Sequence, residues 1–203
     1  MKKIFFIIVV IALIAISVFL FWQVTNSPQY SLKKLDTAIE EHDVNAFNKY
    51  VDLDATVDEV IVQTWQYYTA GEATGSRWSE IRSEIGNTLL SVVKPNIKEM
   101  IKKEVTGYIA TGEWPGNSTD NGSGISSIII NIIKEKIDPG QWDQQSINYT
   151  EIDGKIAHVG LTYFDKSRDT NFLLEVKMRD MNGYWQIIEL SNIAQILNMY
   201  QNN

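Results

Sequence analysis

Cysteine is absent from the 203 residues of this chain, and histidine occurs only twice, at His42 and His158. Without a thiol there can be no disulfide, thiolate metal ligand, cysteine nucleophile or lipid-modified cysteine. No motif supplies the two histidines with a nucleophile and an orienting carboxylate, so we assign both to structural roles. The sequence therefore predicts no catalytic, cofactor-binding or metal-ligating residues.

Positive charge is also scarce, because 18 Lys and Arg stand against 25 Asp and Glu, a net charge of −7. Neutralisation of phosphates supplies most of the affinity of proteins for nucleic acids, so an acidic chain without a basic stripe predicts no nucleic-acid partner. Apolar residues make up 44% of the chain and charged residues 21%, which is typical of a folded globular protein.

One long apolar run begins near the N-terminus. From Ile4 to Trp22 every residue except Ser17 is apolar, and these 19 residues would form a helix about 28 Å long, close to the hydrocarbon thickness of a bilayer. Lys2 and Lys3 precede the run and favour a cytoplasmic N-terminus. We therefore predict a transmembrane anchor over residues 1–24 in the cell membrane, with the lipid bilayer as partner and the remainder outside the cytoplasm.

Two other interpretations of this run compete with the anchor. A cleaved signal peptide needs small residues at its end, and Ala15-Ile16-Ser17 provides a crude version, but cleavage there would leave an apolar new N-terminus. A buried core helix would be shorter and would show a polar face. The sequence favours the anchor.

The rest of the chain begins with helical patterns. We predict a linker over residues 25–30 and one domain over residues 31–203, with helices capped by Ser31 and Asp43 and a third starting near Asp54, where Thr56 and Glu59 have capping-box spacing. Residues 76–109 follow as a long helix or two, broken or kinked at Pro95. A turn-rich loop over 112–124 and an apolar helix over 125–137 complete this half.

The apolar period then changes to two. Strands are expected over residues 147–152 and 155–164, on either side of the turn pair Asp153-Gly154, and over 172–178 and 184–190, joined through Asn182-Gly183. Ser191 is expected to cap a closing helix. The prediction is an α+β domain: a mainly helical half packed on one face of a C-terminal four-stranded antiparallel meander, with the other face half solvated.

The residues from Ser27-Pro28-Gln29-Tyr30-Ser31-Leu32 through His42-Asp43 to Phe47-Asn48-Lys49-Tyr50-Val51-Asp52 resemble a bacterial family catalogued as domain of unknown function 2939 (DUF2939). The resemblance implies an N-terminal membrane segment followed by two short helices, and it carries no assigned activity. The overall plan, with its ending Gly183-Tyr184-Trp185-Gln186-Ile187-Ile188, is also similar to NTF2-like and cystatin-like envelope domains, which implies a helix pair before a curved antiparallel sheet.

Acidic clusters raise the question of metal sites. Asp52, Asp54, Asp58 and Glu59 suggest a calcium loop, but an EF-hand counted from Asp52 has Val57 where Gly is needed and Gln63 where Glu is needed. Helix capping explains these acids better. The loop over residues 117–124 lacks a closing carboxylate and fits neither a cation loop nor a phosphate loop.

Other candidates meet only in the folded chain. Possible members of a carboxylate pair are Glu72, Glu80, Glu113 and Asp165, and nothing in the sequence selects two of them. The aromatic residues that could line a pocket are Trp65, Tyr67, Tyr68, Trp78, Trp114 and Trp142. Trp65, Tyr68 and Trp78 fit helix core positions, whereas Trp114, beside a proline in a loop, is a candidate contact residue.

These observations favour a single-pass membrane protein whose extracytoplasmic domain is a non-catalytic binding or accessory module, with an envelope protein as possible partner and its small-molecule ligand open. An NTF2-like membrane-anchored enzyme with an apolar pocket and a buried acid is the alternative. A structural subunit that pairs through its membrane helix is the third interpretation.

Overall fold

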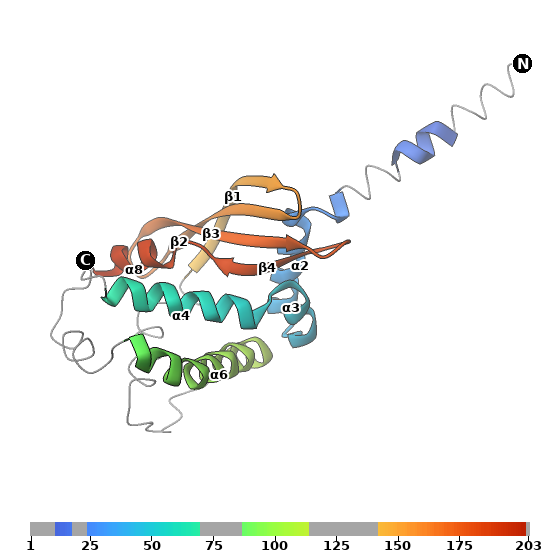
Figure 1. The fold of residues 1–203 in the computed structure, drawn as a ribbon. Helices are drawn as coiled ribbons and strands as arrows, with labels where there is room; N and C mark the ends of the chain where they lie inside the picture. The colour runs from blue at the N-terminus through green and yellow to red at the C-terminus, as the bar shows by residue number, and fades with distance from the viewer. Residues whose placement is uncertain (1–10, 18–23, 70–86, 114–141, 202–203) are drawn as a thin grey trace, which may run out of the picture.

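A computed structural model describes residues 11–17, 24–69, 87–113 and 142–201 (Figure 1). The domain begins with the helices α2 (Pro28–Glu40), α3 (Val44–Tyr50), α4 (Leu53–Thr69) and α6 (Asn87–Thr111). Four strands follow as β1 (Trp142–Asp153), β2 (Ile156–Asp165), β3 (Thr170–Asp180) and β4 (Trp185–Leu190), and α8 (Ile193–Gln201) closes the chain. The predicted α+β order of helices, meander and closing helix is confirmed.

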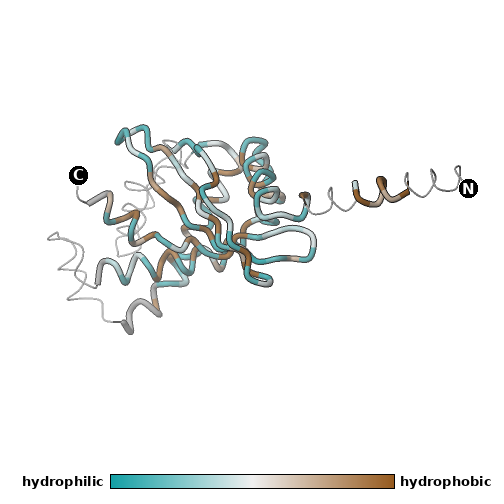
Figure 2. Tube along the Cα trace, turned by 90° about the horizontal axis from the view of Figure 1, so that it is seen from above, coloured by the Kyte–Doolittle hydropathy of each residue, from teal (hydrophilic) through white to brown (hydrophobic). Residues whose placement is uncertain are grey.

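Residues 11–17 are helical and project away from the domain (Figures 1 and 2). The other residues of the predicted anchor, 1–10 and 18–23, lie outside the described residues, as does the predicted helix over 125–137. Within the described ranges, no helix has the length and apolar character needed to span a membrane.

Helix α2 begins earlier than the sequence pattern predicts. The cap is Ser27, whose hydroxyl accepts a hydrogen bond from the Tyr30 N–H at 3.2 Å, and Pro28 occupies the first turn. The predicted linker therefore overlaps this turn. Ser31, expected as the cap, is instead fully buried inside the helix, and its hydroxyl accepts a 2.8 Å hydrogen bond from the backbone N–H of Trp185 on β4. A tertiary contact, not helix capping, explains this serine.

The next two helix starts are set by aspartates. Asp43 caps α3 as predicted, with one carboxylate oxygen 2.9 Å from the backbone nitrogens of both Asn45 and Ala46. Helix α4 starts one residue before Asp54, and Asp52 accepts the Ala55 N–H at 3.1 Å. The capping box predicted at Thr56 is wrong, because Thr56 lies inside the helix with its side chain buried.

Pro95 lies inside α6, which is one continuous helix from Asn87 to Thr111, so of the two predicted outcomes the break is wrong and the kink stays a prediction. A proline removes one backbone donor from a helix. Here its ring is exposed, and on both sides of it α6 is held against α4, through Lys94 before the proline and through Ile97 and Ile101 after it. Contacts with α4 on both sides of Pro95 thus support a continuous α6.

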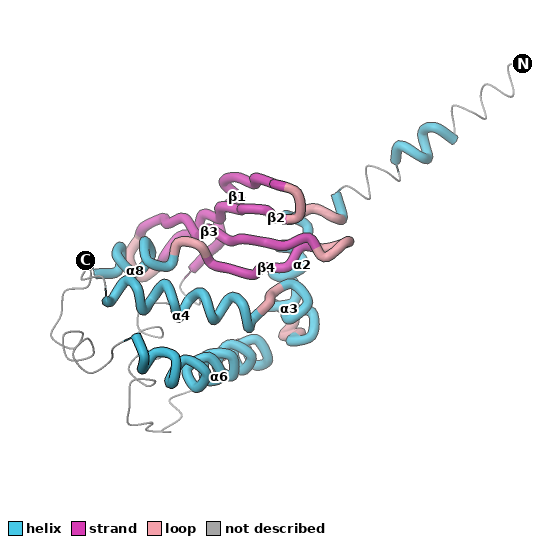
Figure 3. The backbone as a smooth tube through the Cα atoms, in the orientation of Figure 1, coloured by secondary structure: helices cyan, strands magenta, loops and turns pink. Residues whose placement is uncertain are grey.

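The sheet has the order β1-β2-β3-β4 with every neighbour antiparallel (Figure 3). Gly154 in the first hairpin and Asn182 and Gly183 in the last have positive φ, as the turn pairs predict. Beyond β4, Val51 forms a parallel bridge with Ile187 and extends that edge. Strand β1 is the opposite edge of the described sheet, and its pairing is interrupted by two register shifts.

One sheet face is covered by helices and the other is half solvated, as expected. The covered face carries the alternating residues Ala157, Val159 and Leu161 of β2 and Val176 and Met178 of β3, all buried. These residues form one core cluster with α2 and α3, and α4 packs on β4, α6 and α8. On the outer face, Leu173, Glu175 and Lys177 keep intermediate exposure.

Candidate functional site

A cavity of about 260 Å³ lies between the covered face of the sheet and the helices α3, α4, α6 and α8. We call it the core cavity. Its sheet side is formed by Trp142, Leu174, Ile187 and Leu190, and its helix side includes Phe47, Val57, Val60, Ile101, Ile193 and Ile196. These residues come from seven elements spread along the chain from α3 to α8, so the space exists only in the folded chain.

The lining of the core cavity is almost entirely apolar. Among the described lining residues only Thr56 and Trp142 carry a polar side-chain group, and none is charged. The Thr56 side chain is buried, and its hydroxyl has no hydrogen-bond partner in the part of the chain that the structure describes. The surface exposed to the cavity is therefore apolar, and the site can bury an apolar molecule.

The rim between β4 and α8 is fixed by the side chain of Gln63 on α4. Its amide nitrogen donates to the Leu190 carbonyl at 2.7 Å, and its amide oxygen accepts the Ile193 N–H at 3.1 Å. Leu190 and Ile193 are both cavity residues. One polar side chain thus satisfies the backbone where the last strand passes into the closing helix.

The start of α8 departs from the expected serine cap. The helix begins at Ile193, and Asn192 before it is buried, with its amide accepting the Glu175 N–H at 2.9 Å and donating to the Leu173 carbonyl at 2.7 Å. Ser191 donates its backbone N–H to the Glu175 carbonyl. Ser191 and Asn192 thus hydrogen-bond to the backbone of β3 just after the end of β4, and these bonds hold the start of α8 against the sheet.

Trp142 belongs to an aromatic cluster at one end of the cavity. Its ring centroid lies 4.9 Å from that of Phe172 and 6.2 Å from that of Tyr163, so three adjacent strands each contribute one ring. Burial raises the pKa of Tyr163 to about 12, and the negative charge of Asp36 on α2 adds to the shift. Tyr163 is therefore a neutral phenol at physiological pH.

The other aromatic candidates have structural positions or are not described. Trp65 and Tyr67 are buried on α4, and Tyr67 packs against Ile193 and Leu197 of α8. Trp78, Trp114 and the side chain of Tyr68 lie outside the described residues. Of the six aromatic candidates, Trp142 is the one that the structure places on the cavity wall.

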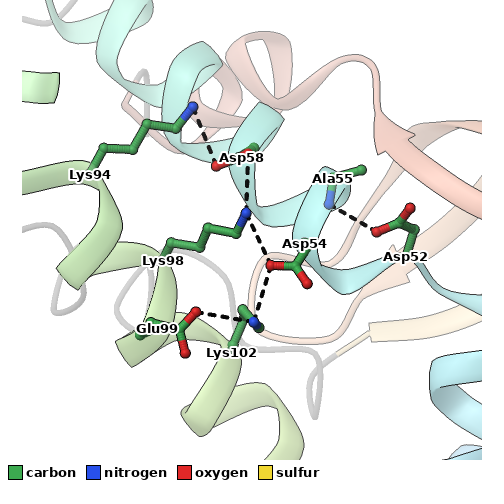
Figure 4. A network of polar contacts seen from close by, with 8 residues as sticks. All are labelled: Asp52, Asp54, Ala55, Asp58, Lys94, Lys98, Glu99 and Lys102. Atoms are coloured by element: carbon green, nitrogen blue, oxygen red, sulfur yellow. Dashed lines mark hydrogen bonds and ion pairs between the residues drawn. The ribbon is translucent and has the colours of Figure 1, made fainter.

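Two members of the acidic cluster, Asp54 and Asp58, form ion pairs between helices (Figure 4). Asp54 on α4 lies 3.0 Å from Lys98 and 3.1 Å from Lys102 of α6, and Asp58 lies 3.3 Å from Lys94 and 3.2 Å from Lys98. Hydrogen bonds from Lys98 and Lys102 lower the pKa of Asp54. We call this set the ion-pair ladder. Among the described residues, no group of His, Asp and Glu side chains is arranged to hold a metal ion.

Two carboxylate candidates are described. Asp165 is fully buried at the end of β2, where one oxygen accepts the Ser167 N–H at 2.8 Å and its hydroxyl at 2.6 Å, and the other lies 3.1 Å from Arg168. These contacts organise the turn into β3. Glu113 is exposed after α6, and Glu72 and Glu80 lie outside the described residues, as does the loop over 117–124.

The two histidines are on different parts of the domain. His42 follows the end of α2 with a positive φ of 58°, and its Nδ1 lies 2.9 Å from the Ile109 carbonyl oxygen in the last turn of α6. It joins two helix ends, a role that an imidazole N–H donor suits. His158 is exposed on the outer sheet face. The contact of His42 agrees with the structural role expected for it, and the role of His158 stays a prediction.

The ion-pair ladder has a signal in the sequence that helix capping alone does not explain. Lys94, Lys98 and Lys102 recur every four residues, and Asp54 and Asp58 have the same spacing, which is typical of two facing helix stripes of opposite charge. The core cavity has no comparable signal in the sequence.

No protein-family model, curated protein or solved structure matches this chain, so its function has to be inferred from the site itself.

Proposed function

We propose that this chain is a single-pass membrane protein whose domain acts outside the cytoplasm as a non-catalytic binding module, with the core cavity as its ligand site. The observation that carries the proposal is the composition of the cavity wall. Apolar residues from the sheet and four helices enclose about 260 Å³, and no charged group of the described residues contributes to that wall. Such a site supplies binding energy through apolar burial.

The chemistry of the wall supports binding better than catalysis. Acid–base or nucleophilic catalysis needs positioned titratable groups next to the bound molecule. The buried acid Asp165 is engaged by Ser167 and Arg168 in a turn and is not a cavity residue. The enzyme alternative would require a carboxylate in the cavity wall.

The membrane part of the proposal is supported by the apolar run from Ile4 to Trp22. In the described piece of it, Ile11, Leu13, Ile14 and Ile16 are each more than half exposed, although they are strongly apolar. The Ser17 hydroxyl donates to the Leu13 carbonyl at 2.8 Å, so its polar group is satisfied within the helix. Side chains of this kind are stable when hydrocarbon surrounds them. The resemblance to DUF2939, which implies a membrane segment followed by two short helices, is part of the same proposal.

Placement can be tested with fusions after Asn203. Alkaline phosphatase, which is active only outside the cytoplasm, is expected to be active there, and a reporter that works only in the cytoplasm is expected to be silent. The untrimmed chain should also stay with membranes during carbonate washing. The reverse reporter pattern, or release by carbonate, would refute the placement.

Binding can be tested separately with xenon, which enters dry apolar cavities. In the full chain in lipid nanodiscs, xenon is expected to shift the methyl resonances of Ile101, Ile187 and Ile196. A Val60→Phe substitution should fill the space and abolish those shifts, whereas Val92→Phe, at an exposed position of α6, should leave them unchanged. Equal shifts in all three proteins would exclude the cavity as the site.

A further inference from the structure

We infer that the ligand of the core cavity is a small neutral molecule with an apolar body and one carbonyl oxygen, and that the Thr56 hydroxyl donates a hydrogen bond to this oxygen. The inference rests on the proposed function and adds a ligand class and a specificity residue to it. Thr56 combines two properties: it lines the cavity, and its hydroxyl has no partner among the described residues.

The backbone of Thr56 leaves only the hydroxyl available for a ligand. Its N–H donates to the Asp52 carbonyl at 2.9 Å, as expected inside a helix. Thr56 is 7% exposed, and its hydroxyl oxygen is inaccessible both from solvent and from the cavity in the rotamer that the structure shows. Buried hydroxyl groups are normally hydrogen-bonded, and an unpaired one is stabilised by any acceptor that enters beside it. A change from one staggered χ1 rotamer to another can bring the hydroxyl to the position now held by the methyl group, while the methyl group moves to the position of the Cβ hydrogen, so the hydroxyl can turn to an arriving ligand.

The wall also defines the charge of the ligand. A charged group placed among apolar side chains would lose its hydration without gaining a counter-ion. The nearest acids on α4, Asp54 and Asp58, are not cavity residues and already pair with lysines of α6. A free fatty acid or an amine is therefore disfavoured, and a neutral carbonyl compound is favoured.

Volume limits the size of the ligand. The cavity exceeds the roughly 150 Å³ of an engineered apolar cavity that binds benzene. At about 260 Å³ it lies just below the range of typical drug-sized pockets, which starts at about 300 Å³. A linear or singly branched molecule of a few carbon atoms fits this space, whereas a complete phospholipid does not.

The test compares two probes that differ in one oxygen, heptane and 2-heptanone, on the full chain in lipid nanodiscs. Methyl resonances of Ile101, Ile187, Ile193 and Ile196 report occupancy of the cavity independently of probe dissolved in lipid. With free probe concentrations corrected for lipid partition, the unmodified chain is expected to bind 2-heptanone about five- to tenfold more tightly than heptane, as a single hydrogen bond allows.

Three measurements on two variants make the result specific. Thr56→Val keeps the shape and removes the hydroxyl, so the two probes should bind equally, with heptane affinity unchanged. Thr56→Ser keeps the hydroxyl and should keep the preference. Without a probe, Thr56→Val should not lower the melting temperature, because it removes an unpaired polar group.

Equal binding of both probes to the unmodified chain, or a preference that survives in Thr56→Val, would overturn the role of Thr56 and leave the cavity as a binding site. Absence of binding by either probe, in a chain whose methyl spectrum shows a folded domain, would overturn this inference. Should xenon also fail to enter, the proposed binding site would fall with it. The Thr56→Ser variant covers the case in which Thr56→Val does not fold.

Discussion

The hydroxyl of Ser31 on α2 accepts a hydrogen bond of 2.8 Å from the backbone N–H of Trp185 on β4, across 154 positions of sequence. Ser31 is completely buried and Trp185 is 6% exposed. The indole nitrogen of Trp185 also donates to the Asn26 carbonyl at 2.8 Å. The first helix and the last strand of the domain are therefore joined at one point by a buried polar contact.

Replacing Ser31 with alanine should lower the free energy of unfolding by about 1–3 kcal/mol, because the buried Trp185 N–H would lose its acceptor. Urea denaturation followed by circular dichroism measures this change. The matched control is Ser27→Ala, which removes the helix cap and should cost about 1 kcal/mol. A smaller loss for Ser31→Ala than for Ser27→Ala would contradict the buried role.

Gly160 on β2 is required by the ring of Tyr149 on β1. A Cβ atom at position 160 would lie 2.3 Å from a ring carbon of Tyr149, whose hydroxyl donates to Glu175 at 2.9 Å. We expect Gly160→Ala to destabilise the domain by about 1–3 kcal/mol through overpacking. The double variant Gly160→Ala with Tyr149→Ala should recover part of this loss, and its failure to do so would place the clash elsewhere.

The same tyrosine gives a pH dependence. Burial, together with the hydrogen bond to Glu175, raises the pKa of Tyr149 to about 12 from the ordinary value of 10.0. The neutral phenol favours the folded state, so this contribution is complete below pH 10.0 and is lost as the pH rises toward 12. The stability difference between the unmodified chain and Tyr149→Phe should shrink over this interval, and a constant difference would refute the assignment.

Replacing Asp36 should change the free energy of unfolding in the opposite direction to replacing an ion-paired aspartate. It keeps exposed surface, but partial desolvation and the neighbouring Glu40 raise its pKa above the ordinary value of 3.8. Its charge therefore disfavours folding at neutral pH, and Asp36→Asn should stabilise the domain by less than about 1 kcal/mol after allowance for solvent screening. The gain should vanish below pH 3.8.

The pKa of Tyr163 provides a local measure of the effect of Asp36→Asn. Because the charge of Asp36 adds to the raised pKa of Tyr163, that pKa should fall in Asp36→Asn while staying above 10.0, since burial is its larger cause. Carbon-13 resonances of the tyrosine rings can follow this titration. Asp43→Asn is the control, because it also replaces an aspartate, but one that caps α3 and is not a cause of the raised pKa of Tyr163. An unchanged Tyr163 titration in Asp36→Asn would exclude the interaction.

The ion-pair ladder predicts acid and salt sensitivity without metal dependence. Lys98 and Lys102 lower the pKa of Asp54, so its contribution is present above pH 3.8 and is lost as the pH falls through the lower folded value. Asp54→Asn should remove that loss and cost less than about 1 kcal/mol at neutral pH, because the group is exposed. Salt at about 1 M should weaken the unmodified chain more than this variant. A rise in melting temperature with calcium would contradict the ladder.

Sequence patterns predicted both hairpins and the later three strands well because their causes are local, whereas β1 begins five residues before its predicted start at Ile147. Alternation of apolar residues decides which sheet face is buried, and Asp153-Gly154 and Asn182-Gly183 supply the positive φ that tight hairpins need. The cap at Asp43 was predictable for the same reason, since its carboxylate binds N–H groups only two and three residues away.

The predicted helix cap at Ser31 is wrong because the role of this serine depends on a contact that is distant in sequence. Ser27 and Ser31 are both chemically suited to cap a helix, and the choice between them depends on Trp185, far along the chain. Continuity of α6 at Pro95 likewise depends on contacts with α4. The core cavity is the extreme case, because its wall combines residues from Phe47 to Ile196 that acquire a common function only when packed.

The uneven pairing of β1 has a consequence for self-association. Its register with β2 shifts between Gln144 and Ser146 and again between Ile147 and Tyr149, so the longest run in unbroken register is Tyr149–Asp153, five residues. Amyloid zippers form from segments of about six or seven residues with low charge. This run is shorter and contains Glu151 and Asp153. Copies crowded together in a cell should therefore resist fibril growth along this edge.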